Sequence, residues 1–331
     1  MKALVYTANE EMTYRDEPPP QPGDGDALVE IDSVGICGSD MHAYRGHDPR
    51  RKPPLILGHE AVGTVIHGAL RGQKVLLNPL ITCGTCRDCL GGQQNLCAQR
   101  DLIGMYRPGA FAEQIAIPET NLIPLPAGMD AQHAALTEPG ATALHAIGLA
   151  EKNRTRPISE SRALVFGAGS VGLLTALILL DKGVDEIHLA ETNALRRAAA
   201  KKEFAGKCEV FDPMKTKPQD AAFDVVFDAV GNSHTRTAAI ACACPGAVIV
   251  HIGLMDSGGE MDVRRMTLQE ITFIGSYTYT PNDLRVTLDK LHGGALGKLD
   301  WLEQRPLANG ARAFADLLAG NCAAAKIVLK I

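Results

Sequence analysis

The sequence is poor in several features that would place it in a specialised class of protein. Only 5% of its 331 residues are aromatic and one is tryptophan, so the hydrophobic core must be largely aliphatic. The formal net charge is -5 and no basic block occurs, which argues against binding to nucleic acid or to an anionic membrane surface. The longest apolar run, Val171–Leu180, is far shorter than the roughly 20 residues that a membrane-spanning helix needs.

A secretory signal is also missing from the start of the chain. The run MKALVYTANEEMTYRDE contains one lysine and then turns acidic, without the apolar stretch of a signal peptide. We therefore expect a soluble cytoplasmic protein without disulfides. Five of its nine cysteines have spacings typical of metal ligands. The other four are expected to be small buried hydrophobic residues: Cys208, Cys242, Cys244 and Cys322.

Length and patterning predict two domains. The first part of the chain is rich in glycine and proline, and its short alternating runs indicate strands at residues 2–6, 27–34, 63–66, 73–77 and 113–117. After a polar stretch at residues 151–161, apolar strands and helices alternate to about residue 253. This alternation is typical of βαβ units, so we expect an α/β fold in which a doubly wound parallel sheet follows a β-rich domain.

A glycine-rich loop follows the apolar run 163–166 and opens a predicted helix over residues 170–182. The loop fits the G-x-G-x-x-G pattern of dinucleotide-binding sites, with Gly167, Gly169 and Gly172 as its glycines and Ser170 and Val171 between them. The first glycine allows a tight turn, the second lets the backbone approach a pyrophosphate, and the third permits close packing of the helix on the strand. Free N–H groups at the helix start would then bind the phosphates.

The second strand of such a unit should end in an acidic residue that accepts hydrogen bonds from the ribose 2′-OH. Glu191 stands at this place, after the run 187–190. Its charge would repel a 2′-phosphate, so the sequence favours NAD over NADP. Arg196 and Arg197 leave NADP open, because a nearby arginine can accommodate that phosphate.

Four cysteines form the most specific pattern in the chain. Cys83, Cys86, Cys89 and Cys97 have the spacing C-x2-C-x2-C-x7-C, which predicts a closed, all-thiolate zinc site that holds its loop in shape. The alternative is an iron–sulfur cluster, since a ferredoxin run also begins C-x2-C-x2-C. In that run the fourth cysteine follows after three residues and precedes a proline, whereas here the gap is seven and Ala98 follows.

A second set of metal-ligand residues is spread over three short motifs. Cys37 lies in GICGSDMH, His59 in GHEAVG, and Glu138 precedes Pro139 in a predicted helical stretch. A catalytic zinc takes three protein ligands and keeps one position open for substrate, and thiolate, imidazole and carboxylate are all suitable donors.

The order and spacing of these motifs, together with the glycine loop, resemble the zinc-containing medium-chain dehydrogenase/reductase superfamily over essentially the whole chain. Within it the sequence is most similar to sorbitol (polyol) dehydrogenases and their bacterial relatives. The resemblance implies a GroES-like catalytic domain over residues 1–150 with a structural zinc lobe at 83–97. It also implies that a C-terminal segment of about 288–331 completes this domain, and that residues 151–287 form a Rossmann NAD-binding domain.

The resemblance also implies residue roles. Cys37 and His59 match the catalytic zinc ligands, and Glu138 stands where polyol dehydrogenases have the third ligand or its water-linked substitute. Glu60 matches a second carboxylate that can approach the metal, and sequence alone does not choose between the two. The resemblance implies further roles around the zinc: Asp40 orients the zinc-bound histidine, and Lys326 pairs with Glu60. Ser39 accepts the substrate proton, and His42 receives it later in a proton relay. Contacts to the cofactor are implied for Thr142, Val230 and Ile252.

On the substrate side the resemblance implies contacts from Tyr44 and Tyr279, but the arginine that precedes this second tyrosine in sorbitol-type enzymes is Thr278 here. We expect an enzyme with two zinc ions per chain that transfers a hydride between a secondary alcohol or polyol and NAD(H). The alternatives are a threonine-type amino-alcohol or simple alcohol dehydrogenase, and a non-catalytic NAD-binding protein. The partners expected are a small-molecule substrate and further copies of the chain, in a homodimer or homotetramer built by edge pairing of the Rossmann sheets.

Overall fold

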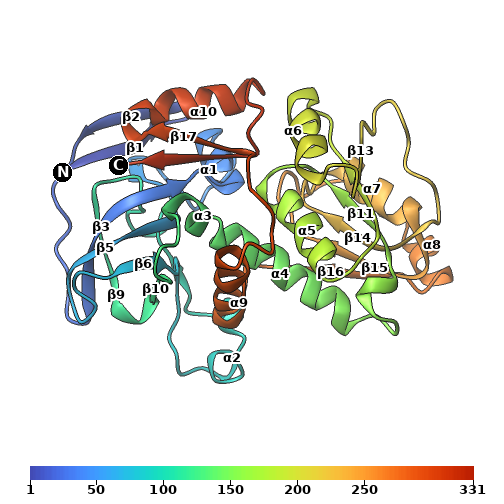
Figure 1. Ribbon diagram of the computed structural model, residues 1–331, viewed down its shortest axis with the longest axis horizontal. Helices are drawn as coiled ribbons and strands as arrows, with labels where there is room; N and C mark the ends of the chain where they lie inside the picture. Colours follow the sequence, from blue (N-terminus) through green and yellow to red (C-terminus); the bar gives the residue numbers. More distant parts are fainter.

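The computed structural model describes residues 1–331 and shows a β-rich lobe and an α/β lobe, with helices α4 (Thr137–Lys152) and α9 (Pro281–His292) between them (Figure 1). Both chain termini lie in the β-rich lobe (Figure 1). None of the helices is both long and apolar enough to cross a membrane.

The β-rich lobe is built on a seven-stranded sheet of order β10-β6-β5-β3-β18-β17, with β9 paired to β3, and on a three-stranded sheet of order β2-β1-β4. The last strand of the chain runs antiparallel to β3, and Val328 pairs with Gly35. The C-terminal segment is therefore an integral part of this lobe. Its strands are β1 (Lys2–Ala8), β2 (Glu11–Asp16), β3 (Asp26–Gly35), β4 (Leu55–Ile56), β5 (Glu60–His67), β6 (Lys74–Leu77), β9 (Gln114–Pro118), β10 (Leu122–Pro124), β17 (Leu302–Pro306) and β18 (Lys326–Lys330).

Shorter elements complete this lobe. A separate two-stranded ribbon of β7 and β8 lies beside the loop that carries the four cysteines. These elements are β7 (Leu80–Ile81), β8 (Asp101–Leu102), α1 (Gly38–Tyr44), α2 (Arg87–Leu90), α3 (Ala131–Ala135) and α10 (Gly310–Leu318).

The α/β lobe contains one six-stranded sheet of order β13-β12-β11-β14-β15-β16, in which every neighbouring pair is parallel. Numbered within the lobe, this is the order 3-2-1-4-5-6 of a doubly wound dinucleotide-binding sheet, which confirms the predicted fold class. The elements are β11 (Arg162–Phe166), α5 (Ser170–Asp181), β12 (Glu186–Ala190), α6 (Ala194–Phe204), β13 (Glu209–Phe211), β14 (Phe223–Asp228), α7 (Ser233–Cys242), β15 (Ala243–His251), α8 (Val263–Leu268) and β16 (Thr272–Gly275).

Each lobe has its own core, and both cores are mainly aliphatic, as the shortage of aromatic residues requires. The core of the α/β lobe already includes Ala143, Leu144, Ala146, Ile147 and Ala150 of α4, and it extends to Trp301. The exact division into domains stays a prediction. Of the four cysteines expected in the core, Cys208, Cys242 and Cys322 are buried and Cys244 is half-buried.

Candidate active site

The β-rich lobe brings Cys37, His59 and Glu60 together at the ends of two paired strands. Cys37 stands immediately before α1, and the other two open β5, with Glu60 opposite Gly35 of β3. The thiol, imidazole and carboxylate donor atoms all lie within 4.8 Å of one another. These are the donor types that zinc prefers, so the group fits a metal ion of that kind.

The residues around His59 hold its ring in place. Asp40 is fully buried, and its Oδ1 lies 3.5 Å from Nδ1 of His59 while its Oδ2 accepts a 3.0 Å hydrogen bond from the backbone N–H of Cys37. The other ring nitrogen, Nε2, lies 3.5 Å from the hydroxyl of Ser39. A carboxylate behind a metal-binding imidazole is the usual orienting arrangement.

Glu60 is also bound to a lysine from the far end of the chain. The Nζ of Lys326 in β18 donates to both carboxylate oxygens, at 2.6 and 2.7 Å, and to the carbonyl of Ile36 at 2.8 Å. Both side chains are almost completely buried. Gly35 makes room for this pair, since a Cβ there would lie 2.0 Å from Oε2 of Glu60.

Glu138 lies in the first turn of α4, buried beside the same group, although its carboxylate is outside the Cys37–His59–Glu60 set. Burial is the main cause that raises the pKa of Glu138 to about 7; the neighbouring Glu60 charge also raises it, and His59 opposes it. Tyr279 is buried next to it, and its hydroxyl has no hydrogen-bond partner. The structure thus places Glu138 and Tyr279 together at the edge of the site.

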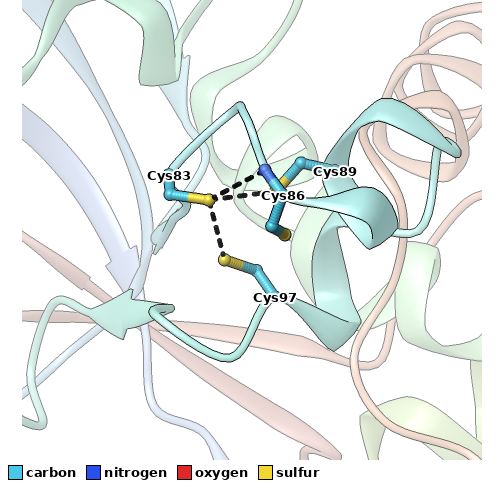
Figure 2. A group of neighbouring side chains, drawn as sticks. All are labelled: Cys83, Cys86, Cys89 and Cys97. Carbon is cyan, nitrogen blue, oxygen red and sulfur yellow. Dashed lines mark hydrogen bonds between the residues drawn. The ribbon is translucent and has the colours of Figure 1, made fainter.

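The four cysteines of the 83–97 loop converge on a common centre (Figure 2). The sulfur of Cys83 lies 3.8 Å from that of Cys89 and 3.5 Å from that of Cys97. Tetrahedral zinc with bonds of about 2.3 Å would set its sulfur ligands about 3.8 Å apart, so the spacing fits a single ion. In an iron–sulfur cluster the cysteines bind different iron atoms. Backbone N–H groups of Thr85 and Cys86 lower the pKa of Cys83 to about 6, which favours the thiolate.

The glycine loop has the geometry that the sequence pattern predicts. Gly167 has φ of +94°, and a Cβ there would lie 2.8 Å from a methyl group of Val230. A Cβ on Gly172 would lie 1.8 Å from the carbonyl oxygen of Gly167, whereas one on Gly169 would meet nothing within 4 Å. The loop is therefore open only at its middle glycine, next to Ser170 and Val171 at the start of α5. A pyrophosphate fits that opening.

Glu191 directly follows β12 as expected, and its carboxylate already has partners. One oxygen accepts a 2.8 Å hydrogen bond from the backbone of Ala168 in the glycine loop, and the other accepts one of 2.7 Å from the backbone of Asn193. Arg197 is occupied by Asp212 at 3.1 Å and by backbone carbonyls. Arg196 is half-buried, and its Nε has no partner.

The remaining predicted residues are divided between the site and the core. Ile252 follows β15 and Thr142 lies in α4, one turn after Glu138. His42 is half-buried in α1. The ring of Tyr44 packs on Phe314 in the core of the β-rich lobe, with ring centroids 5.2 Å apart. Tyr44 is thus part of that core, and its expected substrate contact stays a prediction.

Two buried charged residues at the sites were missed from the sequence. Asp228, at the end of β14, accepts hydrogen bonds from the backbone of Val230 and Gly231, and so shapes the loop opposite the glycine turn. Its position at the end of an apolar run in the sequence could have indicated a functional acidic residue. Arg51 lies beside Ser39, and nothing in the local sequence marks it.

A doubly wound sheet with an open glycine loop, in one chain with a zinc-type donor set, defines the class of zinc-binding, nucleotide-linked oxidoreductases. Comparison with known proteins agrees. Residues 23–127 match the alcohol dehydrogenase GroES-like domain, and residues 170–293 match the zinc-binding dehydrogenase family.

Individual relatives cover most of the chain. The L-galactonate-5-dehydrogenase of Escherichia coli K12 is 32% identical over 295 residues, or 86% of this chain and 85% of that protein. The L-threonine 3-dehydrogenase of Mesorhizobium japonicum is 32% identical over 84% of this chain and 83% of its own. The structure of acetophenone reductase from Geotrichum candidum in complex with NAD superimposes with a TM-score of 0.89 at 26% identity, covering 100% of this chain and 97% of that one.

The chain therefore belongs to the zinc-containing medium-chain dehydrogenase/reductase family. It is a zinc-dependent dehydrogenase of the alcohol and polyol class, which confirms the function expected from the motifs.

Proposed function

We propose that this enzyme transfers a hydride between a secondary alcohol or polyol, or its ketone, and NAD(H), at a zinc site held by Cys37, His59 and a carboxylate. The observation that carries the proposal is the convergence of a thiol, an imidazole and a carboxylate within 4.8 Å. The relatives that act on L-galactonate and on L-threonine both support alcohol oxidation, and they keep an amino alcohol open as the second candidate.

The choice between the two carboxylates follows from charge. Both oxygens of Glu60 already accept hydrogen bonds from Lys326, so an ammonium balances that carboxylate. Glu138 is buried without such a partner, and its raised pKa reports the cost of its charge there. We propose that Glu138 is the third zinc ligand, directly or through water. Glu60 is then a second carboxylate that can approach the metal.

The chemistry that a bound zinc supplies is polarisation of the substrate oxygen, and NAD supplies the hydride acceptor. We propose that Ser39 takes the alcohol proton; the 3.5 Å distance between its hydroxyl and the ring of His59 supports this role. Burial lowers the pKa of His42, with the charges of Arg45 and His47 adding to the effect. A neutral His42 at pH 7 can accept the proton that Ser39 passes on.

We propose NAD rather than NADP as the cofactor because Glu191 puts a carboxylate at the end of β12, where a 2′-phosphate would lie. Arg197, the other candidate for binding such a phosphate, is held by Asp212. The contacts proposed for the cofactor come from Gly167, Gly169, Ser170, Val171, Gly172, Glu191, Arg196, Thr142, Val230 and Ile252. Tyr279 is proposed on the substrate side.

We also propose that the enzyme acts in the cytoplasm as a homodimer or homotetramer. The strand β16 is at an edge of the six-stranded sheet, so its outer backbone groups are available for pairing. The segment between β15 and β16 carries exposed apolar side chains: Leu254, Met255, Val263 and Leu268. An exposed group of this kind beside a sheet edge is typical of an interface.

Metal content and turnover of a Cys37→Ser variant test the proposed site. The purified enzyme should contain two zinc ions per chain and no iron, and the variant should contain one zinc and lose NAD-linked turnover at least about 1000-fold while unfolding as the parent does. Half-buried Cys244, outside both metal groups, offers the control Cys244→Ser, which should keep both ions and activity. A parent protein with one zinc, or a Cys37 variant that still turns over, would contradict the proposal. The substrates to screen are polyols, sugar acids, simple secondary alcohols and L-threonine, each with NAD and with NADP.

A further inference from the structure

Asn95 is a buried amide in the 83–97 loop that the proposed reaction does not use. It lies in the short 3₁₀ helix η1 (Gln94–Leu96) and is 3% exposed. Its Nδ2 donates to the backbone carbonyl of Tyr277 at 2.9 Å and lies 3.5 Å from Nε2 of His145. These partners are 182 and 50 positions away in sequence, so Asn95 connects the loop to two segments outside it.

His145 extends this connection to α9. It lies in α4, about two turns after Glu138 and on the same side of the helix. Its Nδ1 is 2.9 Å from Oδ2 of Asp283, which also accepts the backbone N–H and the hydroxyl of Thr280, each at 2.8 Å. Burial alone would raise the pKa of Asp283, but the hydrogen bonds from His145 and Thr280 lower it. The carboxylate therefore accepts from Nδ1–H of His145, and Nε2 is left as the acceptor that faces Asn95.

The backbone between these contacts is strained. Thr278 has φ of +46°, in the left-handed region that a β-branched residue rarely adopts, and its hydroxyl is buried without a partner. Such a conformation persists only where surrounding contacts hold it. Contacts of this kind lie on both sides of Thr278, since Asn95 binds the carbonyl of Tyr277 and Asp283 binds Thr280.

A second contact joins the loop region to Tyr277. The guanidinium of Arg100 stacks over the tyrosine ring, with 4.8 Å between Cζ and the ring centroid. Nη1 of Arg100 donates to the carbonyl of Cys97 at 2.9 Å. Tyr277 is therefore bound at its backbone by Asn95 and at its ring by Arg100, two residues on either side of the last cysteine of the loop.

Tyr279 directly follows the strained residue. It is 1% exposed, and burial together with the charge of the neighbouring Glu138 raises its pKa. Glu138 and His145 belong to one helix, and His145 contacts Asp283 of the segment that carries Tyr279. The contacts around residues 277–283 thus hold Tyr279 beside Glu138.

We propose that Asn95, Arg100 and His145 are positioning residues that hold the 277–283 segment in its strained conformation. The segment in turn places Tyr279 on the substrate side of the site. The inference rests on the proposed function, because the substrate contact of Tyr279 belongs to it. The 83–97 loop then contributes to substrate binding as well as to local shape, since it carries the amide that binds Tyr277.

Hydrogen–deuterium exchange measured by mass spectrometry tests the placement independently of activity. In the enzyme with both zinc sites filled, Asn95→Ala should speed exchange in the peptide covering residues 277–283 about tenfold, because a buried hydrogen bond contributes on that scale. Peptides from β12 and α6 in the α/β lobe should exchange as in the parent. Exchange at the parent rate in the 277–283 peptide overturns the inference.

A double-mutant cycle tests whether the placement acts through Tyr279. Asn95→Ala should lower kcat/KM for the best alcohol about tenfold, mainly through a higher KM, but less than about twofold when Tyr279→Phe is already present. Equal losses in both backgrounds show that Asn95 acts apart from Tyr279, and they overturn the inference. If Tyr279→Phe alone keeps the parent kinetics, the proposed substrate contact is wrong instead, and the exchange measurement still decides whether Asn95 holds the segment.

Arg100 offers a second variant at an exposed position, for the case that Asn95→Ala does not fold. Arg100→Gln removes the stacking on Tyr277 and should speed exchange in the 277–283 peptide about threefold. Arg87→Gln removes the same charge from a side chain of the 83–97 loop that is 96% exposed, and it should keep the parent exchange and kcat/KM. Identical exchange in these two variants contradicts the inference.

Discussion

Three buried carboxylates surround the Cys37–His59 pair, and each is stabilised differently. Burial alone would raise the pKa of Asp40, but the charge and hydrogen bond of His59 outweigh it and lower that pKa. Glu60 is bound by Lys326, which has no access to solvent. Glu138 has no such ion pair, and burial raises its pKa to about 7. At the residue scale, carboxyl groups in one site therefore have different partners, and Glu138 is the one without an ion pair.

Asp48 supports a prediction about acid stability. Burial would raise its pKa, but hydrogen bonds from Arg50 and the charge of Arg51 lower it from 3.8 to about 2. A lowered pKa contributes stability that is fully present above pH 4 and is lost as the pH falls through 2. Asp48→Asn should therefore lower the free energy of unfolding at pH 7 by about 2 kcal/mol.

The same pair of proteins provides the pH test. The difference in unfolding free energy, measured by urea denaturation, should shrink as the pH falls from 4 toward 2. Protonation of the metal ligands affects both proteins alike, so it cancels in the difference. A difference that stays constant over this range would show that the Asp48 charge does not stabilise the fold.

At the scale of elements, two glycines in the loop between β11 and α5 have different functions, one in packing and one in ligand binding. Gly172 is needed for packing, because a Cβ would lie 1.8 Å from the Gly167 carbonyl oxygen. Gly169 precedes the helix as its N-cap and faces open space. Packing and ligand binding can therefore be changed independently within four residues.

The matched substitutions Gly169→Ala and Gly172→Ala test this separation. Gly169→Ala should weaken NAD binding about tenfold or more, because the methyl group occupies the place of the pyrophosphate, and should change stability by less than about 1 kcal/mol. Gly172→Ala should destabilise the protein by about 2 kcal/mol or more, because the backbone must move. Calorimetric NAD titration and urea unfolding measure the two effects. Normal NAD affinity in a folded Gly169 variant would place the pyrophosphate elsewhere.

At the scale of the whole molecule, the chain begins in the β-rich lobe, forms the α/β lobe, and returns to the β-rich lobe at its C-terminal end. The C-terminal strand β18 pairs with β3, so residues as far apart as Ile36 and Lys326, 290 positions in sequence, build one site. The α/β sheet keeps β16 at an exposed edge, unlike the central strands. The two lobes therefore differ: the first is completed by the C-terminal strand, and the second ends in β16, an edge strand.

We predict a particle of at least twice the 35.2 kDa chain mass in light scattering after size-exclusion chromatography. The double substitution Val263→Lys, Leu268→Lys should shift it toward the monomer, since both side chains are about two-thirds exposed and would bring like charges together at an interface. Met214→Lys, at an even more exposed apolar residue elsewhere, should leave the mass unchanged. A parent protein that elutes as a monomer at micromolar concentration contradicts the edge-pairing proposal.

Much of this organisation could be read from local sequence. The strand–glycine–helix pattern at 163–182 predicted β11 and α5, and the four-cysteine spacing predicted a group that the structure brings together. Such features depend on residues close in sequence, where turn geometry and short loops leave few alternatives. The helix α9 was missed although Thr280 and Asp283 form a capping box with a proline between them, a signal that was available.

What the sequence by itself determined was the chemistry: a dinucleotide loop, two sets of zinc donors and an alternating α/β pattern. Only the tertiary structure decided which charges meet. In the folded chain Lys326 forms an ion pair with Glu60, whereas Glu138 has no ion pair of its own. The ring of Tyr44 packs in the core, and Arg51 lies beside Ser39. The reason is physical: the energy of a buried charge depends on partners brought together by sheet pairing across hundreds of residues, and no local pattern records that proximity.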